Sequence, residues 1–158
     1  MYLWNYKTLE RDLQNGPLTS KESFKYFLVF VVLNAAAFEA AQYYAETFSY
    51  LLLANSILSF LFVLLGTIWS YTANKSGDGA NFIERFISLG IPIGVRVVVL
   101  WGVLYLSYLI LGNIFIKGFA SFNEHTTYVD IIFTVLIYLY FYSRVVASLR
   151  SIATGRAT

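Results

Sequence analysis

The sequence contains no cysteine, which excludes disulfide bonds, thiolate metal sites and thiol nucleophiles. Only 13% of its 158 residues are charged, about half the share that a water-soluble domain carries. The net charge of +2 provides no basic surface for a nucleic-acid backbone. These shortages argue against a water-soluble enzyme and against a nucleic-acid-binding protein.

Histidine is nearly absent as well, since His125 is the only one in the sequence. A Ser-His-Asp triad would depend on this residue, as would a metal site with Glu124 and Asp130. One histidine and two carboxylates in a loop give poor ligand geometry. The glycine-rich run 77–79 lacks the spacing and the Lys-Ser/Thr ending of a phosphate-binding loop. The sequence therefore predicts a non-enzymatic protein without a metal site or cofactor.

Apolar residues, by contrast, make up 58% of the sequence and are gathered into four long blocks. A helix needs about 20 apolar residues to cross about 30 Å of hydrocarbon. Two blocks contain long uncharged runs, of 28 residues between Glu46 and Lys75 and of 20 residues between Arg96 and Lys117. The outer two blocks contain charges, but their composition also suits a membrane. We predict an all-α integral membrane protein, a four-transmembrane-helix bundle in a single domain over 1–158, with spans at about 24–44, 50–71, 91–114 and 128–149.

Two amphipathic segments are expected to lie on the membrane surface. In 1–18, apolar residues recur at helical spacing, and Asn15-Gly16-Pro17 ends the pattern. Thr19 and Glu22 then have the spacing of a capping box that begins the first span. Residues 80–89 form the second amphipathic pattern, and Pro92 favours a sharp bend between this surface helix and the third span.

The distribution of basic residues predicts the orientation in the membrane. Ten of the eleven lie in the two ends of the chain and around the second loop, whereas the opposite side has only Lys117. Basic loops face the cytoplasm, so we expect both termini inside, in a bacterial inner membrane. Four arginines should lie near this inner boundary, where they either hold anionic lipid headgroups or an acidic partner, or serve orientation alone. They are Arg85, Arg96, Arg144 and Arg150.

Small residues mark a helix-packing face in the third predicted span. Gly90 and Gly94 have the GxxxG spacing, and Gly102 follows on the same face. Small residues let two helix backbones approach closely in lipid. The face could meet another helix of the same chain or a second subunit, and the sequence leaves both open.

One acidic residue, Glu39, lies inside the first predicted span. At 1.5 Å per residue it lies about two thirds of the way across the membrane. We predict that it points into the bundle towards Asn55, within a polar layer; the alternative is that it reaches the outer headgroups. The other members of the layer are Ser59, Tyr108 and Thr134.

These features favour a small membrane module that self-associates, as a scaffold, a sensor or a narrow ion-conducting assembly. One alternative is an accessory or immunity-type subunit that binds a larger membrane protein. Another is a small proton-coupled transporter that uses Glu39. The expected partners are membrane lipids and either further copies of the chain or another membrane protein. Flux in vesicles would distinguish a transporter, and copurification would distinguish an accessory subunit.

Overall fold

The computed structural model describes residues 2–42, 49–115 and 127–155, and the backbone alone for residues 35–42. These residues form five helices and no strand. The helices α3, α4 and α6 are long and apolar enough to cross a membrane, whereas α2 is not among those that meet this criterion within the described residues. The prediction of an all-helical membrane protein is confirmed in this coarser form. The helices are α1 (Tyr6–Asn15), α2 (Ser20–Gln42), α3 (Tyr50–Lys75), α4 (Phe82–Phe115) and α6 (Tyr128–Thr154).

Side-chain caps explain where several helices begin. The predicted capping box at the start of α2 is confirmed: the Glu22 carboxylate accepts from the Thr19 amide at 3.3 Å, and the Glu22 amide donates to the Thr19 hydroxyl at 3.4 Å. Thr127 and Asp130 form the same arrangement at the start of α6. Each box satisfies amide groups that the first turn of a helix leaves without a partner.

The prediction of a separate surface helix over 80–89 is wrong in one respect. The structure has no break before the third span, because α4 is a single helix of 34 residues with Pro92 inside it. Proline removes one backbone donor from a helix, but it does not end the helix where tertiary packing holds both sides. Leu89, Ile91 and Ile93 are all buried here. Packing around Pro92 therefore outweighs its local cost.

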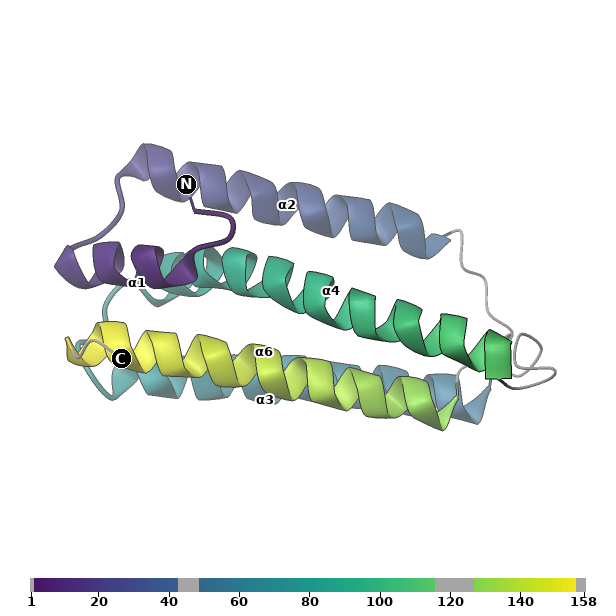
Figure 1. The fold of residues 1–158 in the computed structure, drawn as a ribbon. Helices are drawn as coiled ribbons and strands as arrows, with labels where there is room; N and C mark the ends of the chain where they lie inside the picture. Colours follow the sequence, from purple (N-terminus) through teal and green to yellow (C-terminus); the bar gives the residue numbers. More distant parts are fainter. Residues whose placement is uncertain (1, 43–48, 116–126, 156–158) are drawn as a thin grey trace.

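The N-terminal segment is helical as predicted, but its apolar face packs on protein. Leu9 and Leu13 of α1 have exposed fractions of 0% and 2%. They belong to a core cluster that includes Val97 of α4 and Leu149 of α6. The helix α1 therefore closes one end of the bundle, which we call the α1 end, and Figure 1 shows both described chain ends there.

The helices α3 and α6 form the most extensive pair and run in the same direction. Phe62 stacks on Tyr138, and the Tyr142 hydroxyl donates to the Val63 carbonyl at 3.2 Å. Buried positions on α3 fall at Gly66, Ser70, Ala73 and Asn74. Their spacing of four and three residues is that of a packed helix seam.

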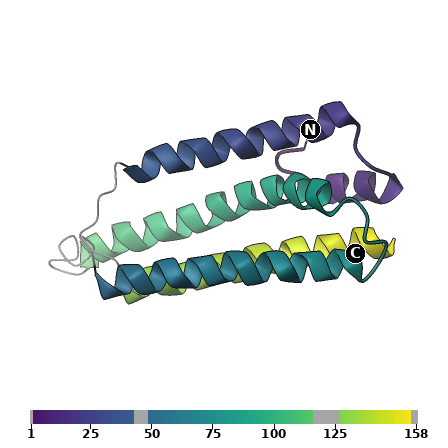
Figure 2. The same cartoon turned by 180° about the vertical axis from the view of Figure 1, so that it is seen from behind.

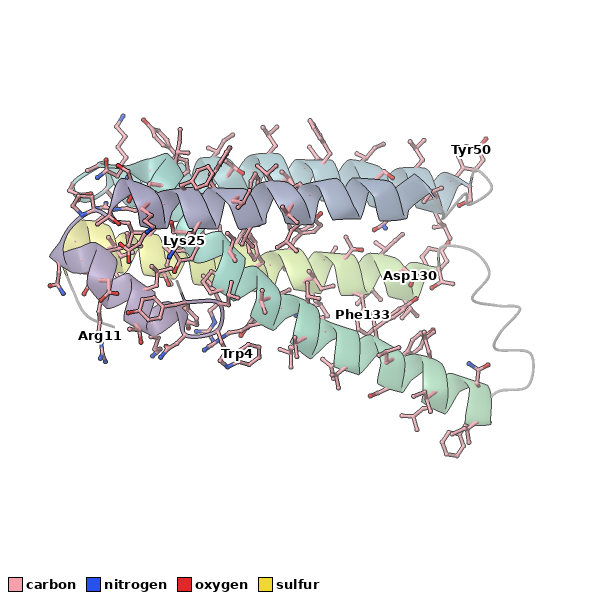
Figure 3. The ribbon with its side chains drawn as sticks, turned by 90° about the horizontal axis from the view of Figure 1, so that it is seen from above. Trp4, Arg11, Lys25, Tyr50, Asp130 and Phe133 are labelled. Carbon is pink, nitrogen blue, oxygen red and sulfur yellow. The ribbon has the colours of Figure 1, made fainter. Side chains whose placement is uncertain are left out.

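The remaining long helices form layers on this pair. The helix α4 lies between α2 on one side and the α3–α6 pair on the other, as Figures 1 and 2 both show. Among the described residues, α2 packs mainly on α4, and its buried Tyr26 joins the core cluster that contains Leu9 of α1. Figure 3 shows α4 diverging from its neighbours as it leaves the α1 end. The core is consequently concentrated at the α1 end, and the other half of α4 exposes large apolar side chains such as Val103 and Phe115.

Candidate functional site

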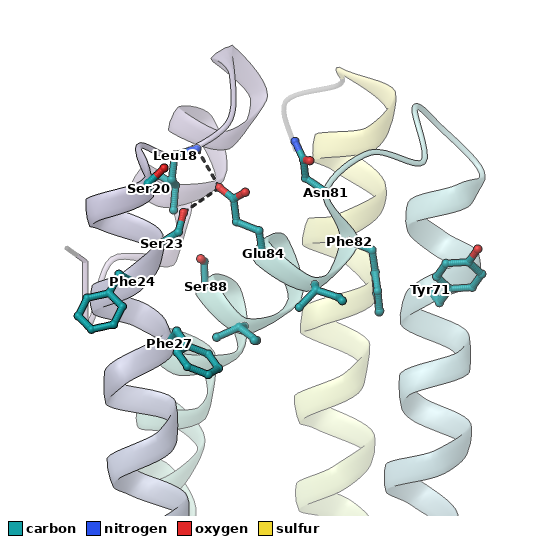
Figure 4. A pocket seen from close by; sticks show the side chains of 12 residues that line it. Leu18, Ser20, Ser23, Phe24, Phe27, Tyr71, Asn81, Phe82, Glu84 and Ser88 are labelled. Carbon is teal, nitrogen blue, oxygen red and sulfur yellow. Dashed lines mark hydrogen bonds between the residues drawn. The ribbon is translucent and has the colours of Figure 1, made fainter.

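A large hollow lies between α2 and α4 near the α1 end, and we call it the α2–α4 groove. It encloses about 830 Å³. Glu84 is its central polar group: one carboxylate oxygen, Oε1, accepts from the Leu18 amide at 3.0 Å and from the Ser23 hydroxyl at 3.1 Å. Figure 4 shows these two bonds tying the start of α2 to the first turn of α4. Glu84 therefore positions α2 against the rest of the bundle.

The walls of the α2–α4 groove are both polar and apolar. Ser20, Ser23 and Ser88 line the groove together with Glu84, and Phe24 and Phe27 of α2 line it below the start of that helix (Figure 4). Ile87 of α4 is a further apolar lining residue. No lysine or arginine lines the groove among the described residues. The groove can therefore receive a molecule with a polar, positively charged end and an apolar body.

A second polar cluster holds the turn between α3 and α4. The Arg85 guanidinium makes a two-pronged ion pair with Asp78, at 2.6 and 2.7 Å, and donates to Asn74 Oδ1 at 3.1 Å. The Arg85 side chain is 9% exposed and the Asp78 side chain 43% exposed. The hydrogen bonds from Arg85 hold the pKa of Asp78 below its ordinary value. The turn is also bonded to α6, because the Asp78 amide donates to the Ala153 carbonyl at 3.0 Å.

The four arginines predicted to form a headgroup or partner site have separate surroundings in the structure. Arg85 is committed to Asp78 and Asn74. The Arg96 guanidinium lies over the rings of Trp4 and Tyr6, and its Nε donates to the Trp4 carbonyl at 2.7 Å.

The other two, Arg144 and Arg150, are exposed on α6. The Arg144 guanidinium lies 5.3 Å from the centre of the Tyr140 ring. Two of the four arginines are thus bound within the fold, which argues against a shared anion site.

The described members of the predicted polar layer lie on three helices, with Asn55 and Ser59 on α3, Tyr108 on α4 and Thr134 on α6. The Glu39 side chain lies outside the described residues, so its pairing with Asn55 stays a prediction. The Asn55 Oδ1 atom is buried without a hydrogen-bond partner. Tyr108 packs on Phe133 at 6.1 Å between ring centres.

Thr134 lines a separate cavity of about 340 Å³ between α4 and α6. It shares this cavity with Tyr105, whose hydroxyl donates to Asp130 at 3.0 Å. Ser59, on α3, is half-buried. The structure thus places Thr134 in a cavity that aromatic and apolar side chains line together with Asp130, and the polar layer stays a prediction.

The predicted glycine face makes ordinary contacts. A Cβ at Gly90 or Gly94 would lie 3.8 Å from the Phe141 ring, and a Cβ at Gly102 would meet nothing within 4 Å. The first two glycines therefore face α6 of the same chain. The close approaches lie elsewhere: a Cβ at Gly66 would overlap the Tyr142 ring, and one at Gly77 would overlap the Ala153 backbone.

Sequence reasoning missed Glu84 as a site residue. A signal for the closest packing was also present, because Gly66 and Ser70 have small-xxx-small spacing. Comparison with known proteins adds no further assignment: no family model, no curated protein and no solved structure matches this chain.

Proposed function

We propose that the protein is a non-enzymatic membrane module of four spans, with α2 as the first, that works as an assembly of identical copies. The 23 residues of α2 extend about 34 Å at 1.5 Å per residue, enough to cross the hydrocarbon. Several of its described apolar side chains, including Phe24, Phe27 and Val32, are at least half exposed, as lipid-facing residues are. The basic residues at the α1 end favour placing that end in the cytoplasm of a bacterial cell.

The observation that carries self-association is an exposed asparagine in the middle of α2. Asn34 lies about 21 Å from the start of α2, near the centre of the bilayer in this arrangement. Its Nδ2 donates to the Phe30 carbonyl at 2.8 Å, whereas its Oδ1 has no partner among the described residues. Hydrocarbon cannot satisfy an amide oxygen, but a second asparagine can.

The packing of α2 leaves room for such a partner. Among the described helices α2 packs mainly on α4, and its Tyr26 also joins the core cluster of α1, so much of its circumference is open. The exposed side chains of α2 that precede Asn34, from Phe27 to Leu33, are apolar, which allows a second copy to lie against them. We infer that two α2 helices pair around Asn34, and that the pair assembles a scaffold, sensor or ion-conducting unit.

The test is energy transfer between donor- and acceptor-labelled copies in liposomes of increasing lipid-to-protein ratio. Asn34→Leu should weaken association by about 3- to 20-fold, the range expected for one hydrogen bond between membrane helices. Val32→Leu is the matched control, since it changes an exposed apolar residue of the same helix and should have no effect.

Equal transfer from the wild type and Asn34→Leu would show that Asn34 does not mediate pairing. Loss of all specific transfer for the wild type would overturn self-association and favour the accessory subunit with a different membrane partner. A Glu39→Gln variant tests the transporter alternative, because removal of the titrating group should abolish pH-dependent flux.

A further inference from the structure

The α2–α4 groove has both polar and apolar lining residues, as a binding site for an amphiphilic molecule requires. Ser23 and Glu84 lie in the first turns of α2 and α4, and Phe27 and Ile87 lie about one turn farther along their helices. The carboxylate is thus next to apolar side chains, and a molecule with a polar group and an apolar body suits the groove. Its volume of about 830 Å³ is within the usual range of small-molecule sites, about 300–1,000 Å³.

The charge in the groove is negative and uncompensated. Glu84 Oε1 takes both hydrogen bonds from α2, whereas Oε2 has no partner among the described residues. The salt bridge found in the described part of the chain joins Arg85 to Asp78 and does not include Glu84. A carboxylate that is partly removed from water is stabilised by a nearby cation. A positively charged hydrogen-bond donor would therefore fit against Oε2.

The position of the groove indicates the source of that cation. Tyr71 and Phe24 line it, and aromatic residues near helix ends gather at the headgroup level of a bilayer. The helices that border it have exposed apolar side chains beyond it, including Leu28 of α2 and Val98 of α4. A lipid molecule beside α2 and α4 therefore has its headgroup at the depth of Glu84.

We propose that the α2–α4 groove binds one phospholipid with a primary-amine headgroup, of the phosphatidylethanolamine type. The ammonium donates to Glu84 Oε2, and one acyl chain lies along Phe24, Phe27 and Ile87. An anionic headgroup would be repelled by Glu84. A choline headgroup is positive but has no N–H to donate to the carboxylate. The groove thus selects both for charge and for hydrogen bonding.

The experiment measures the lipids retained by the full-length protein. The protein is reconstituted in vesicles of equal parts phosphatidylethanolamine, phosphatidylcholine and phosphatidylglycerol, extracted in mild detergent, and examined by native mass spectrometry. We expect one phosphatidylethanolamine to be retained, at about fivefold or more over the other two lipids. Glu84→Gln should remove this preference while keeping an acceptor for Leu18 and Ser23. Glu22→Gln is the control, because it changes a carboxylate on α2 that does not line the groove.

A second variant tests the site by shape without changing its charge. Ile83 lines the groove and is 72% exposed, so Ile83→Trp narrows the groove with little effect on the core. It should lower lipid retention, whereas Leu28→Trp, outside the groove, should not. Equal retention of the three lipids by the wild type, or an unchanged preference in Glu84→Gln, would overturn the proposal. Energy transfer between copies is measured separately, so a failure here leaves the pairing of α2 helices intact.

Discussion

Gly66 should be the most sensitive small residue in the seam between α3 and α6. A Cβ at this position would overlap the ring of Tyr142 close to its attachment point. The ring cannot move away easily, because Tyr142 is 6% exposed and its hydroxyl is bonded to the Val63 carbonyl. Gly66→Ala therefore forces α3 and α6 apart or twists the ring, and overpacking of this kind costs about 1–3 kcal/mol.

The helix preference of alanine partly offsets this cost, so a matched variant is needed. Alanine favours a helix over glycine by about 1 kcal/mol in water. Gly102→Ala makes the same chemical change inside α4, where a Cβ meets nothing within 4 Å. The gain in helix preference is the same in both variants, so the difference between their free energies of unfolding measures the cost of overpacking at Gly66. We expect Gly66→Ala to unfold with a free energy about 1–3 kcal/mol lower than Gly102→Ala.

Reversible unfolding by sodium dodecyl sulfate in mixed micelles, followed by circular dichroism, measures this difference. The same comparison in a Tyr142→Leu background tests the cause, because a smaller side chain should accept the added methyl group. The penalty of Gly66→Ala should then shrink, as a coupling between residues in contact requires. Identical unfolding curves for Gly66→Ala and Gly102→Ala would refute close packing at Gly66.

Two further predictions concern charge. Asp78→Asn leaves the buried Arg85 without a counter-charge and should lower the free energy of unfolding by about 1–3 kcal/mol, less than for a fully buried pair because Asp78 is 43% exposed. Because the pKa of Asp78 is lowered in the folded state, its ionisation stabilises the wild type above the ordinary aspartate pKa, and this contribution is lost as the pH falls through the lowered value. Unfolding measured from pH 2 to 7 should therefore show that the wild type loses stability below pH about 4. The loss should be smaller in Asp78→Asn, which has no carboxylate at this position. Separately, Ser49→Cys should react with an impermeant thiol reagent in intact cells and Ser76→Cys should not, and the reverse pattern would contradict cytoplasmic termini.

The sequence was sufficient to predict the helices but not which faces meet. Composition and run length predicted α3, α4 and α6 because a bilayer requires long apolar helices. Small-xxx-small spacing occurs at both Gly66–Ser70 and Gly90–Gly94, yet only the first marks an overlap with a neighbouring ring. Spacing shows that a helix could approach closely, whereas the partner and its register are set by tertiary packing.

The N-terminal helix α1 also shows that a sequence pattern does not identify what a helix packs against. Its amphipathic pattern correctly predicted a helix with one apolar face. An apolar helix face can be buried either in lipid or against other helices, so the pattern alone could not show that Leu9 and Leu13 pack against α4 and α6. The cation–π contacts of Arg96 with Trp4 and Tyr6 join this segment to α4 across more than 80 residues, a distance over which local patterns carry no information.

Glu84 and Arg85 show why the charges in the sequence did not predict the α2–α4 groove. In the sequence the charges of these two neighbours cancel, and both lie in the predicted surface helix over 80–89. On a helix with 3.6 residues per turn, however, adjacent side chains point about 100° apart. Arg85 consequently faces the α3–α4 turn, where Asp78 neutralises it, and Glu84 faces α2, where it receives only neutral donors. The ion pair with Asp78 thus removes the one cation that is nearest to Glu84 in sequence, and it leaves the carboxylate to be neutralised by a partner from outside the chain.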